Sequence, residues 1–402
     1  MSRATSMFSD FDRSAMARAL ELADRGLETT HPNPRVGCVI ALDENIVGEG
    51  WHERAGEPHA EVNALRAAGA KAVGATAYVT LEPCSHQGRT PPCVDALLAA
   101  RVARVVFALE DPNPRVSGQG AQTLRRAGVA VESDLMAAEA AELNPGFLKR
   151  MRCGRPWVRV KLAMSLDGRT ALANGASQWI TGLAAREDVQ HWRARSSAIL
   201  TAIGTVLADD PRLNVRLPDP PSGRPRLQPL RVVLDSGLQT PPGARMLTSG
   251  GPVLIMTAAK PSEEEAGFVA RRAELVRRAV EIESVPASSP NPAAGELTAS
   301  AHARLSLPDV LDRLGRREVN ELWVEAGARL AGALLREALV DELIVYIAPK
   351  LLGPQARPLI EMSELRNLQD ALHFTVLEHR QIGEDVRLRL RPRASDPAAS
   401  AG

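Results

Sequence analysis

The stretch LEPCSHQGRTPPC places Cys84 and Cys93 in one short polar turn of a chain that has only four cysteines in 402 residues. Upstream, the stretch EPHAEVNAL carries His59 and Glu61 on either side of an alanine. A His-x-Glu motif followed by Pro-Cys and a later cysteine is the signature of zinc-dependent deaminases. One imidazole and two thiolates suit zinc and leave its fourth position open. We therefore expect His59, Cys84 and Cys93 to bind Zn2+.

An open zinc site predicts hydrolytic chemistry. Zinc lowers the pKa of a bound water and so provides hydroxide at neutral pH. Glu61 is the expected catalytic residue, because its carboxylate can move a proton from the water to a ring nitrogen and to the leaving amine. Cys93 opens a predicted helix, whose positive end favours the thiolate. The predicted reaction is the removal of an amine from a heterocycle.

Other interpretations of the cysteines remain open. A structural zinc site would need a fourth protein ligand, which Cys38, His52 or His86 could supply. A disulfide fits poorly with four cysteines and no export signal, which together indicate a reducing cytoplasm. Cys38 falls in an apolar stretch and Cys153 in a linker, so we expect a core residue and an idle thiol.

The loop between the two cysteines departs from the general signature. That signature leaves two residues between the cysteines, whereas eight residues, SHQGRTPP, stand here. We expect this loop to lengthen the rim of the site, with His86 and Arg89 meeting a polar group or a phosphate of the substrate.

The pentapeptide PNPRV occurs twice, at 32–36 and at 112–116. It is too short to indicate a duplication, and Asn-Pro favours turns. The alternative is that Asn33 or Asn113 lines a pocket at the end of a strand.

The first part of the chain alternates predicted strands and helices. SDFDRSAMARALELADRG predicts a helix with Asp10 or Asp12 as its cap and Gly26 at its end. The stretches RVGCVIAL, ATAYVTL and ARVVFALED predict strands, and HAEVNALRAAGA and CVDALLAAR predict helices. This alternation favours an α/β layer fold with both faces of the sheet covered.

A second α/β series follows the turn-rich, basic stretch NPGFLKRMRCGRPW, so we expect one domain over 1–150 and another over 151–402. Its predicted strands are WVRVKLAMS, LRVVLDS, GPVLIMT, NELWVEA and DELIVYIAP, with helices such as LAAREDVQHWRAR and LAGALLREAL between them. Residues 284–303 are rich in Pro, Ala and Ser and are expected to form a flexible insertion. Residues 393–402 are expected to be a disordered tail.

Composition limits the partners. Apolar residues make up 45%, charged residues 24%, and the net charge is +1, as in an ordinary soluble protein. No apolar run is long enough to span a membrane and no secretory signal opens the chain. We expect a cytoplasmic homo-oligomer that acts on a small molecule and binds neither nucleic acid nor membrane.

Two rival functions remain. A deaminase of another nucleotide or of transfer RNA, with an accessory C-terminal domain, would need a basic face with aromatic residues, yet aromatic residues make up only 3%. A zinc-stabilised binding module without catalysis would not depend on Glu61.

The second half carries a weaker signal. No Gly-x-Gly-x-x-Gly motif follows a strand, which argues against a Rossmann dinucleotide site. In LWVEAGARLAGALL a strand ends at Glu325, and Gly327 and Gly332 flank the start of a helix whose free amides could receive a phosphate. An ordinary tight turn is the alternative. Three arginines could hold a sugar phosphate through paired contacts; they are Arg193, Arg212 and Arg216.

The stretches HPNPRVGCVI, PHAEVNAL and EPCSHQGRTPPC together resemble the deaminase domain of the bifunctional riboflavin-biosynthesis deaminase–reductases. The resemblance extends from about Phe11 to about Arg391. It implies a cytidine-deaminase-like three-layer α/β/α domain followed by a dihydrofolate-reductase-like α/β domain. It also implies two reactions: deamination of 2,5-diamino-6-(5-phosphoribosylamino)pyrimidin-4-one, and reduction of its ribosyl side chain to ribityl by NADPH.

The resemblance also implies roles for individual residues. His59, Cys84 and Cys93 match the zinc ligands, and Glu61 matches the proton shuttle. The residues placed beside NADPH are Ala163, Trp179, Thr205, Asp209, Ser236, Gly327, Ala328, Arg329, Leu330, Ala331, Gly332 and Ala333. The residues placed beside the substrates are Ser177, Arg193, Leu213, Arg216 and Glu325 in the reductase, and Asn33, His86 and Arg89 in the deaminase.

The reductase half departs from the family at one position and leaves its proton donor open. Ala326 stands where the family usually has glycine, which would cost about 1 kcal/mol if the position needs a positive φ. Asp209 and Glu325 are the candidates for the proton donor, and hydride transfer could instead depend mainly on positioning.

Overall fold

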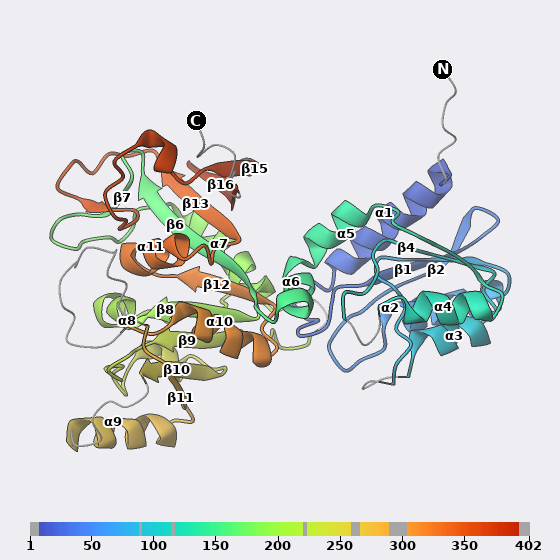
Figure 1. The fold of residues 1–402 in the computed structure, drawn as a ribbon, viewed down its shortest axis with the longest axis horizontal. Coiled ribbons are helices and arrows are strands. Elements are labelled where there is room, and N and C mark those ends of the chain that lie inside the picture. Colours follow the sequence, from blue (N-terminus) through green and yellow to red (C-terminus); the bar gives the residue numbers. More distant parts are fainter. Residues whose placement is uncertain are drawn as a thin grey trace. The chain divides into compact units, whose positions relative to one another are not determined.

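The computed structural model describes residues 8–87, 91–113, 117–219, 223–258, 266–288 and 304–393. The chain forms two compact units, residues 1–155 with 318–320, and residues 156–317 with 321–402 (Figure 1). Helix α6 (Pro145–Cys153) runs across the expected division between residues 150 and 151. Arg89 and the expected tail from residue 394 onward lie outside the described residues.

The first unit is built on a five-stranded sheet with the order β2-β1-β3-β4-β5. Strand β1 is antiparallel to both of its neighbours, and β3, β4 and β5 are parallel. The strands are β1 (Gly37–Leu42), β2 (Asn45–Trp51), β3 (Thr76–Val79), β4 (Arg104–Phe107) and β5 (Ala130–Ser133). The apolar strands β1, β3 and β4 were predicted, whereas the more polar edge strands β2 and β5 were not.

Helices cover both faces of this sheet, as the predicted three-layer α/β/α fold requires. One core cluster joins α1 and α5 to one face, and a second joins α2, α3 and α4 to the other. The helices are α1 (Asp10–Asp24), α2 (Ala60–Ala68), α3 (Cys93–Ala99), α4 (Gln119–Arg126) and α5 (Ala137–Leu143).

The cap of α1 differs from the prediction. Ser9 is the N-cap: its hydroxyl accepts from the Asp12 amide at 3.1 Å, and the Asp12 carboxylate accepts from the Ser9 amide at 2.8 Å. Because the two residues cap each other in a capping box, Asp12 occupies the third helical position and is not the cap itself. The prediction of Asp10 or Asp12 as the cap was wrong.

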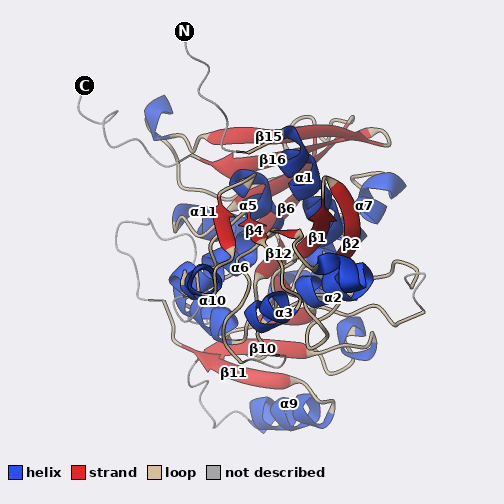
Figure 2. Ribbon diagram, turned by 90° about the vertical axis from the view of Figure 1, so that its right-hand side faces the viewer, coloured by secondary structure: helices blue, strands red, loops and turns tan. Residues whose placement is uncertain are grey.

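The second unit contains a nine-stranded sheet with the order β11-β10-β9-β8-β12-β6-β13-β16-β15. The strands from β11 to β13 in this order are parallel, and the hairpin of β16 and β15 is antiparallel. The strands are β6 (Trp157–Ser165), β8 (Ala198–Ala202), β9 (Leu230–Leu234), β10 (Val253–Ala258), β11 (Glu281–Val285), β12 (Glu321–Glu325), β13 (Glu342–Ala348), β15 (Phe374–Ile382) and β16 (Asp385–Pro392). Figure 2 shows β15 as the outermost strand at one edge.

The remaining elements of this unit are helices and a small strand pair. The helices are α7 (Leu183–Arg195), α8 (Ile203–Asp209), α9 (Ala266–Arg277), α10 (Leu307–Arg316) and α11 (Ala328–Arg336). Strands β7 (Arg169–Ala171) and β14 (Arg357–Pro358) pair with each other. The five predicted strands and the predicted helices α7 and α11 are present. Among the described helices, none is long and apolar enough to cross a bilayer.

The predicted start of the insertion, at residue 284, is too early. Residues 284 and 285 end strand β11, and Ala287 forms a bridge with Leu305. Residues 289–303 lie outside the described residues. The Pro, Ala and Ser content therefore did not reveal that the parallel sheet extends into this stretch.

Candidate active sites

Three separate elements bring His59, Cys84 and Cys93 together. His59 is the N-cap of α2, Cys84 lies in the loop after β3, and Cys93 is the first residue of α3. Their ligand atoms all lie within 4.8 Å of one another. His59 Nδ1 is 3.2 Å from Cys93 Sγ and 3.6 Å from Cys84 Sγ. One imidazole and two thiols at this spacing fit a zinc ion with an open position.

The surroundings of the thiols favour the charged form at Cys84. A hydrogen bond from Cys93 lowers the pKa of Cys84 most, followed by hydrogen bonds from His59 and from the Cys93 amide, whose nitrogen is 3.3 Å from Cys84 Sγ. The hydrogen bond with Cys84 raises the pKa of His59. The start of α3 therefore supplies both a ligand and an amide that stabilises the neighbouring thiolate.

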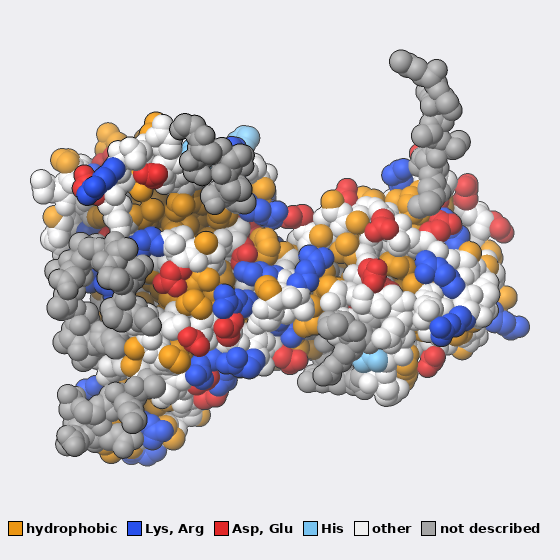
Figure 3. Space-filling model, in the orientation of Figure 1, with side chains coloured by type: hydrophobic (Ala, Val, Ile, Leu, Met, Phe, Trp, Pro, Cys, Tyr) orange, Lys and Arg blue, Asp and Glu red, His pale blue; other side chains and the backbone are white. Residues whose placement is uncertain are grey.

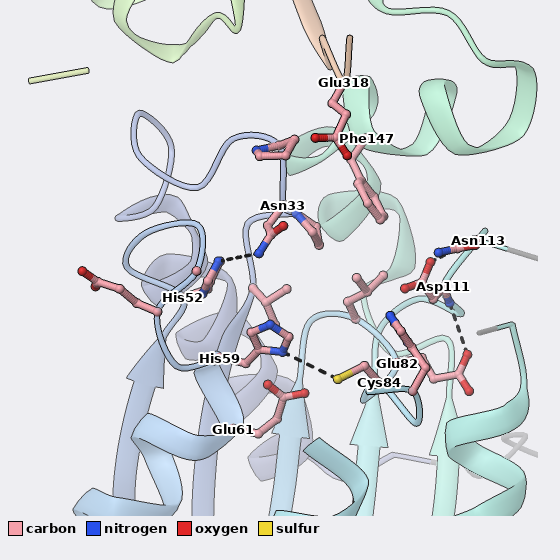
Figure 4. Close-up of a pocket in the computed structure, with 17 residues that line it drawn as sticks. Asn33, His52, His59, Glu61, Glu82, Cys84, Asp111, Asn113, Phe147 and Glu318 are labelled. Atoms are coloured by element: carbon pink, nitrogen blue, oxygen red, sulfur yellow. Dashed lines mark hydrogen bonds between the residues drawn. The ribbon is translucent and has the colours of Figure 1, made fainter. Parts of the chain in front are cut away.

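Glu61 lies in the first turn of α2, beside the three ligand atoms, and its side chain is 3% exposed. Burial raises the pKa of its carboxyl, and the nearby Cys84 raises it further. Figure 4 shows the carboxyl pointing toward the pocket below His59. A carboxyl that readily takes up a proton in this position can serve as acid and base toward a group bound in the pocket.

No described residue supplies a fourth ligand atom. The cluster that could hold a metal consists, among the described residues, of His59, Cys84 and Cys93 alone. Cys38 is fully buried in β1, in the apolar core. Both ring nitrogens of His52 have other partners, and His86 lines the pocket without joining the cluster. These contacts argue against a closed structural zinc site.

A pocket of about 250 Å³ opens beside this cluster, and Asn33 is one of its walls. The His52 ring explains how Asn33 is oriented. His52 Nδ1 is 3.2 Å from the carbonyl oxygen of Pro58, which can only accept, so Nδ1 carries the proton and Nε2 accepts from Asn33 Nδ2 at 3.0 Å. The Asn33 side-chain oxygen is thereby free to accept from a substrate N–H or O–H (Figure 4).

The opposite wall contains Asp111 and Asn113, and Glu82 holds it in place. The Glu82 carboxylate accepts from the amides of Asp111, Gly118 and Ala121 at 3.3, 3.0 and 3.0 Å. Burial raises the pKa of Asp111 to about 6. Asn33 and Asn113, the asparagines of the two PNPRV stretches, therefore both line the pocket. This agrees with the alternative prediction, in which one of them lines a pocket at the end of a strand.

In the second unit, Glu325 ends β12 and binds Arg193 on α7 through two contacts. Arg193 Nε and Nη2 lie 2.6 and 2.8 Å from the two carboxylate oxygens of Glu325. Trp323 Nε1 also donates to Glu325, at 2.7 Å. Burial raises the pKa of Glu325, but Arg193, Lys161 and this hydrogen bond outweigh it and hold the pKa at about 2. The ion pair therefore favours the ionised form of Glu325 over the protonated form that a proton donor needs.

Lys161 on β6 is a functional candidate that the sequence did not reveal. Burial lowers the pKa of its ammonium group, and only the nearby Glu325 opposes that effect among the charges around it. A lysine of lowered pKa can give up a proton more readily than an exposed one. Asp209, the other candidate for the proton donor, is exposed at the end of α8.

The residues expected beside NADPH lie near the carboxyl ends of parallel strands or in the segments that follow those ends. Ala163 lies on β6, Thr205 and Asp209 on α8 after β8, Ser236 after β9, and Gly327 to Ala333 at the start of α11 after β12. The carboxyl ends of parallel strands are where α/β sheets bind ligands. Trp179 is 63% exposed, and the Arg186 guanidinium lies 4.5 Å from its ring centre.

The expected substrate residues of the reductase are placed less uniformly. The Arg216 amide donates a hydrogen bond to the side-chain oxygen of Gln190, and its guanidinium donates one to the side-chain oxygen of Asn214. Leu213 is 1% exposed, because its side chain belongs to the core, so only its main chain can meet a ligand. Ser177 lies in the loop between β7 and α7.

The two glycines before and within α11 have different roles. A Cβ on Gly332 would lie 1.9 Å from the carbonyl oxygen of Glu361, so this glycine allows a close approach of two main chains. A Cβ on Gly327 would meet nothing within 4 Å. Ala326 has no positive φ, so the departure from the family's glycine carries no backbone cost.

The comparisons with known proteins agree with this division. The model of the cytidine and deoxycytidylate deaminase zinc-binding region matches residues 9–109, and that of the RibD C-terminal domain matches residues 156–388. The riboflavin biosynthesis protein RibD of Escherichia coli is 52% identical over 94% of this chain and 99% of its own. That of Aquifex aeolicus is 37% identical over 94% and 98%.

Solved structures show the same similarity. RibD of Acinetobacter baumannii matches with a TM-score of 0.85 and 45% identity, over 96% of this chain and 99% of its own. A deaminase–reductase of Thermotoga maritima matches with a TM-score of 0.78 and 30% identity, over 95% and 99%.

Fold and site together define a two-domain enzyme, with a zinc-dependent cytidine-deaminase-like domain and a dihydrofolate-reductase-like domain that uses NADPH. The chain belongs to the RibD family, the bifunctional deaminase–reductases of riboflavin biosynthesis.

Proposed function

We propose that the chain catalyses two consecutive reactions on 2,5-diamino-6-(5-phosphoribosylamino)pyrimidin-4-one. In the first, water replaces an exocyclic amine, which leaves as ammonia. In the second, a hydride from NADPH and a proton convert the ribosyl side chain of the product to ribityl. The relative from Thermotoga maritima is named as a deaminase and reductase of these two pyrimidines. The observation that carries the proposal is the cluster of His59, Cys84 and Cys93 beside a buried Glu61.

In the deaminase, His59, Cys84 and Cys93 would hold zinc. When bound, zinc supplies Lewis acidity that lowers the pKa of a water in its open position. Glu61 takes up one proton of the attacking water and passes it to the ring nitrogen, and it then moves the remaining proton of that oxygen to the exocyclic amine, which leaves as ammonia. Its position in the first turn of α2, two residues after the histidine ligand, keeps the carboxyl at the reacting atoms.

The pocket walls select and orient the pyrimidine. The oxygen of Asn33, fixed by His52, accepts from an N–H of the substrate. Asp111 and Asn113 line the opposite wall. The expected phosphate contacts of His86 and Arg89 remain proposals; His86 lines the pocket, and Arg89 lies outside the described residues.

In the reductase, the loop at Gly327 and the start of α11 cradle NADPH together with Ala163, Trp179, Thr205, Asp209 and Ser236. NADPH supplies the hydride. The substrate binds beside Glu325, with Arg193, Arg216, Ser177 and the main chain of Leu213 around it. We propose that Lys161 donates the proton, since its pKa is lowered by burial and Glu325 stays ionised.

We also propose a homo-oligomer that works in the cytoplasm and binds no nucleic acid. The near-neutral charge and the small share of aromatic residues support the last point. Mass spectrometry of the pyrimidine products tests the two reactions. We expect the deaminated ribosyl compound without NADPH and the ribityl compound with NADPH. Recovery of the unchanged substrate from zinc-loaded protein would contradict the proposal.

A further inference from the structure

The loop between β7 and α7, residues 172–182, carries two residues that the proposed reductase uses. Ser177 is expected beside the substrate, and Trp179 is expected beside NADPH. The side chain of Trp179 is exposed, so the core of the unit does not hold it in place. A residue that meets a cofactor from such a loop depends on supporting contacts that fix the loop itself.

The loop ends at Gly182, the N-cap of α7, which has no side chain with which to cap the helix. Asp385, at the start of β16, accepts a hydrogen bond from the Gly182 amide at 2.8 Å, although 203 positions separate the two residues. In a capping box, an acidic side chain of the helix itself accepts from the N-cap amide. Asp385 makes the same contact from the turn between β15 and β16 and places a carboxylate at the positive end of α7.

The turn between β15 and β16 is packed closely against the start of α7. Asp385 is 2% exposed. Gly383, in the same turn, has a φ of +61°, and a Cβ at this position would lie 2.9 Å from the Cβ of Ala184. Glycine therefore suits both the backbone angle and the close approach to the helix. The hydrogen bond from Gly182 to Asp385 is thus a fixed part of the packing.

Contacts at the start of α7 extend this constraint to Trp179. Arg186 on α7 donates to the carbonyl oxygen of Thr181 at 3.0 Å, and its guanidinium lies 4.5 Å from the ring centre of Trp179. The cation covers one face of the indole ring. Because the start of α7 determines where Arg186 lies, a shift of the helix at Gly182 would also move the ring.

The surroundings of Trp179 suit a flat ring of a ligand. Lys350 Nζ donates to the Trp179 carbonyl oxygen at 3.3 Å, and the next residue, Leu351, is exposed. Leu166, whose amide donates to the Lys350 carbonyl oxygen at 2.8 Å, is exposed as well. Figure 3 shows apolar side chains exposed over β6 and β13, the strands that lead to these two leucines. An exposed apolar surface of this kind marks a binding site.

We propose that Asp385 is a positioning residue of the reductase. By holding the Gly182 amide, it fixes the 172–182 loop so that Trp179 presents its ring to NADPH. This role rests on the proposed reduction by NADPH and adds to it a residue that acts through the loop. Because the contact needs an acceptor oxygen, asparagine at this position should largely replace aspartate, whereas alanine should not.

Steady-state NADPH oxidation, with the deaminated ribosyl compound as substrate, tests this role. Asp385→Ala should raise the KM for NADPH about tenfold, the loss expected for one hydrogen bond to a charged group, with a smaller change in kcat. Asp385→Asn should recover most of the affinity. The matched control is Glu384→Ala in the same turn, whose exposed side chain should leave both constants unchanged.

Hydrogen–deuterium exchange of the ligand-free protein follows the loop without any reaction. The amides of residues 172–182 should exchange faster in Asp385→Ala and at nearly the wild-type rate in Asp385→Asn, while β8, β9 and β10 keep their protection. Faster exchange throughout the second unit would overturn the positioning role and show a general loss of stability.

The kinetic outcomes separate this role from the proposed function. An unchanged KM for NADPH in Asp385→Ala, with an active wild type, would overturn the positioning role alone. No NADPH oxidation by the wild type would contradict the proposed reduction and, with it, the role of Asp385.

Discussion

Arg193 and Glu325 form a two-pronged ion pair in the reductase unit, with nitrogen–oxygen distances of 2.6 and 2.8 Å. The pair joins α7 to the carboxyl end of β12, where the ligands of this sheet are expected. The glutamate side chain is only 16% exposed, so the pair is largely shielded from water.

The ion pair predicts a dependence of stability on pH. The pKa of Glu325 is lowered from 4.5 to about 2, so the ionised carboxylate stabilises the folded state above pH 4.5. This contribution is on the order of 3 kcal/mol and is lost as the pH falls from 4.5 through 2. Urea unfolding at neutral and acid pH measures it. Glu325→Gln should be less stable at neutral pH and should lose less between the two; an equal loss in both proteins would contradict the assignment.

The cysteine cluster predicts which cysteine substitutions cause the protein to lose zinc. Cys93→Ser should lose zinc, because it removes one of the three ligands and the thiol that hydrogen-bonds to Cys84. Metal analysis of the purified protein after dialysis measures the zinc content. Cys153→Ser is the matched control, since that thiol is exposed and lies outside the cluster. Equal zinc contents in the two variants would rule out the proposed ligands.

The contact between His52 and Asn33 predicts an effect on substrate affinity. His52→Ala removes the acceptor that orients the Asn33 amide. Loss of one such hydrogen bond costs about 1 kcal/mol, and we expect the KM for ammonia release to rise about fivefold with a smaller change in kcat. His52→Gln, which offers another acceptor, should recover part of the loss. An unchanged KM in His52→Ala would show that Asn33 does not depend on the histidine.

The close approach of the Gly332 and Glu361 main chains predicts that an alanine destabilises the protein at position 332 but not at position 327. Gly332→Ala would place a methyl group 1.9 Å from the Glu361 carbonyl oxygen, and the required shift should cost about 1–3 kcal/mol or more. Thermal unfolding followed by calorimetry measures this change. Gly327→Ala, where the added carbon meets nothing within 4 Å, should unfold like the wild type. A similar loss in both variants would contradict the packing argument.

The sequence predicted those parts of the fold that depend on local pattern. Strands such as β10 and β13 are nearly continuous apolar runs, as is typical of strands buried on both faces of a parallel sheet. Strand β16 was not predicted, although its alternation of arginine and apolar residues is a strand pattern. The sequence alone could not show that Arg387 pairs with Asp188 and Glu378 inside the unit. The cap of α1 was misassigned because the paired hydrogen bonds of Ser9 and Asp12 depend on the local backbone geometry.

The candidate sites follow the same rule. The zinc ligands and Glu61 stand in motifs whose spacing indicates their chemistry. His52 was considered only as a ligand, and its hydrogen bond to Asn33 spans 19 residues without any motif. Lys161 lies within an apolar strand sequence, so its nearness to Glu325 appears only once β6 and β12 are paired. The backbone angle at Ala326 likewise required the structure.

The central claim is that one chain deaminates the pyrimidine through Glu61 and then reduces it. NADPH oxidation with the diaminopyrimidinone ribosyl phosphate as substrate tests this claim in zinc-loaded protein. We expect the wild type and the control Glu53→Ala to consume NADPH and Glu61→Ala to consume none. Supplying the deaminated intermediate should restore NADPH oxidation in Glu61→Ala. Full NADPH oxidation by Glu61→Ala without that intermediate, or none by the wild type, would contradict the account.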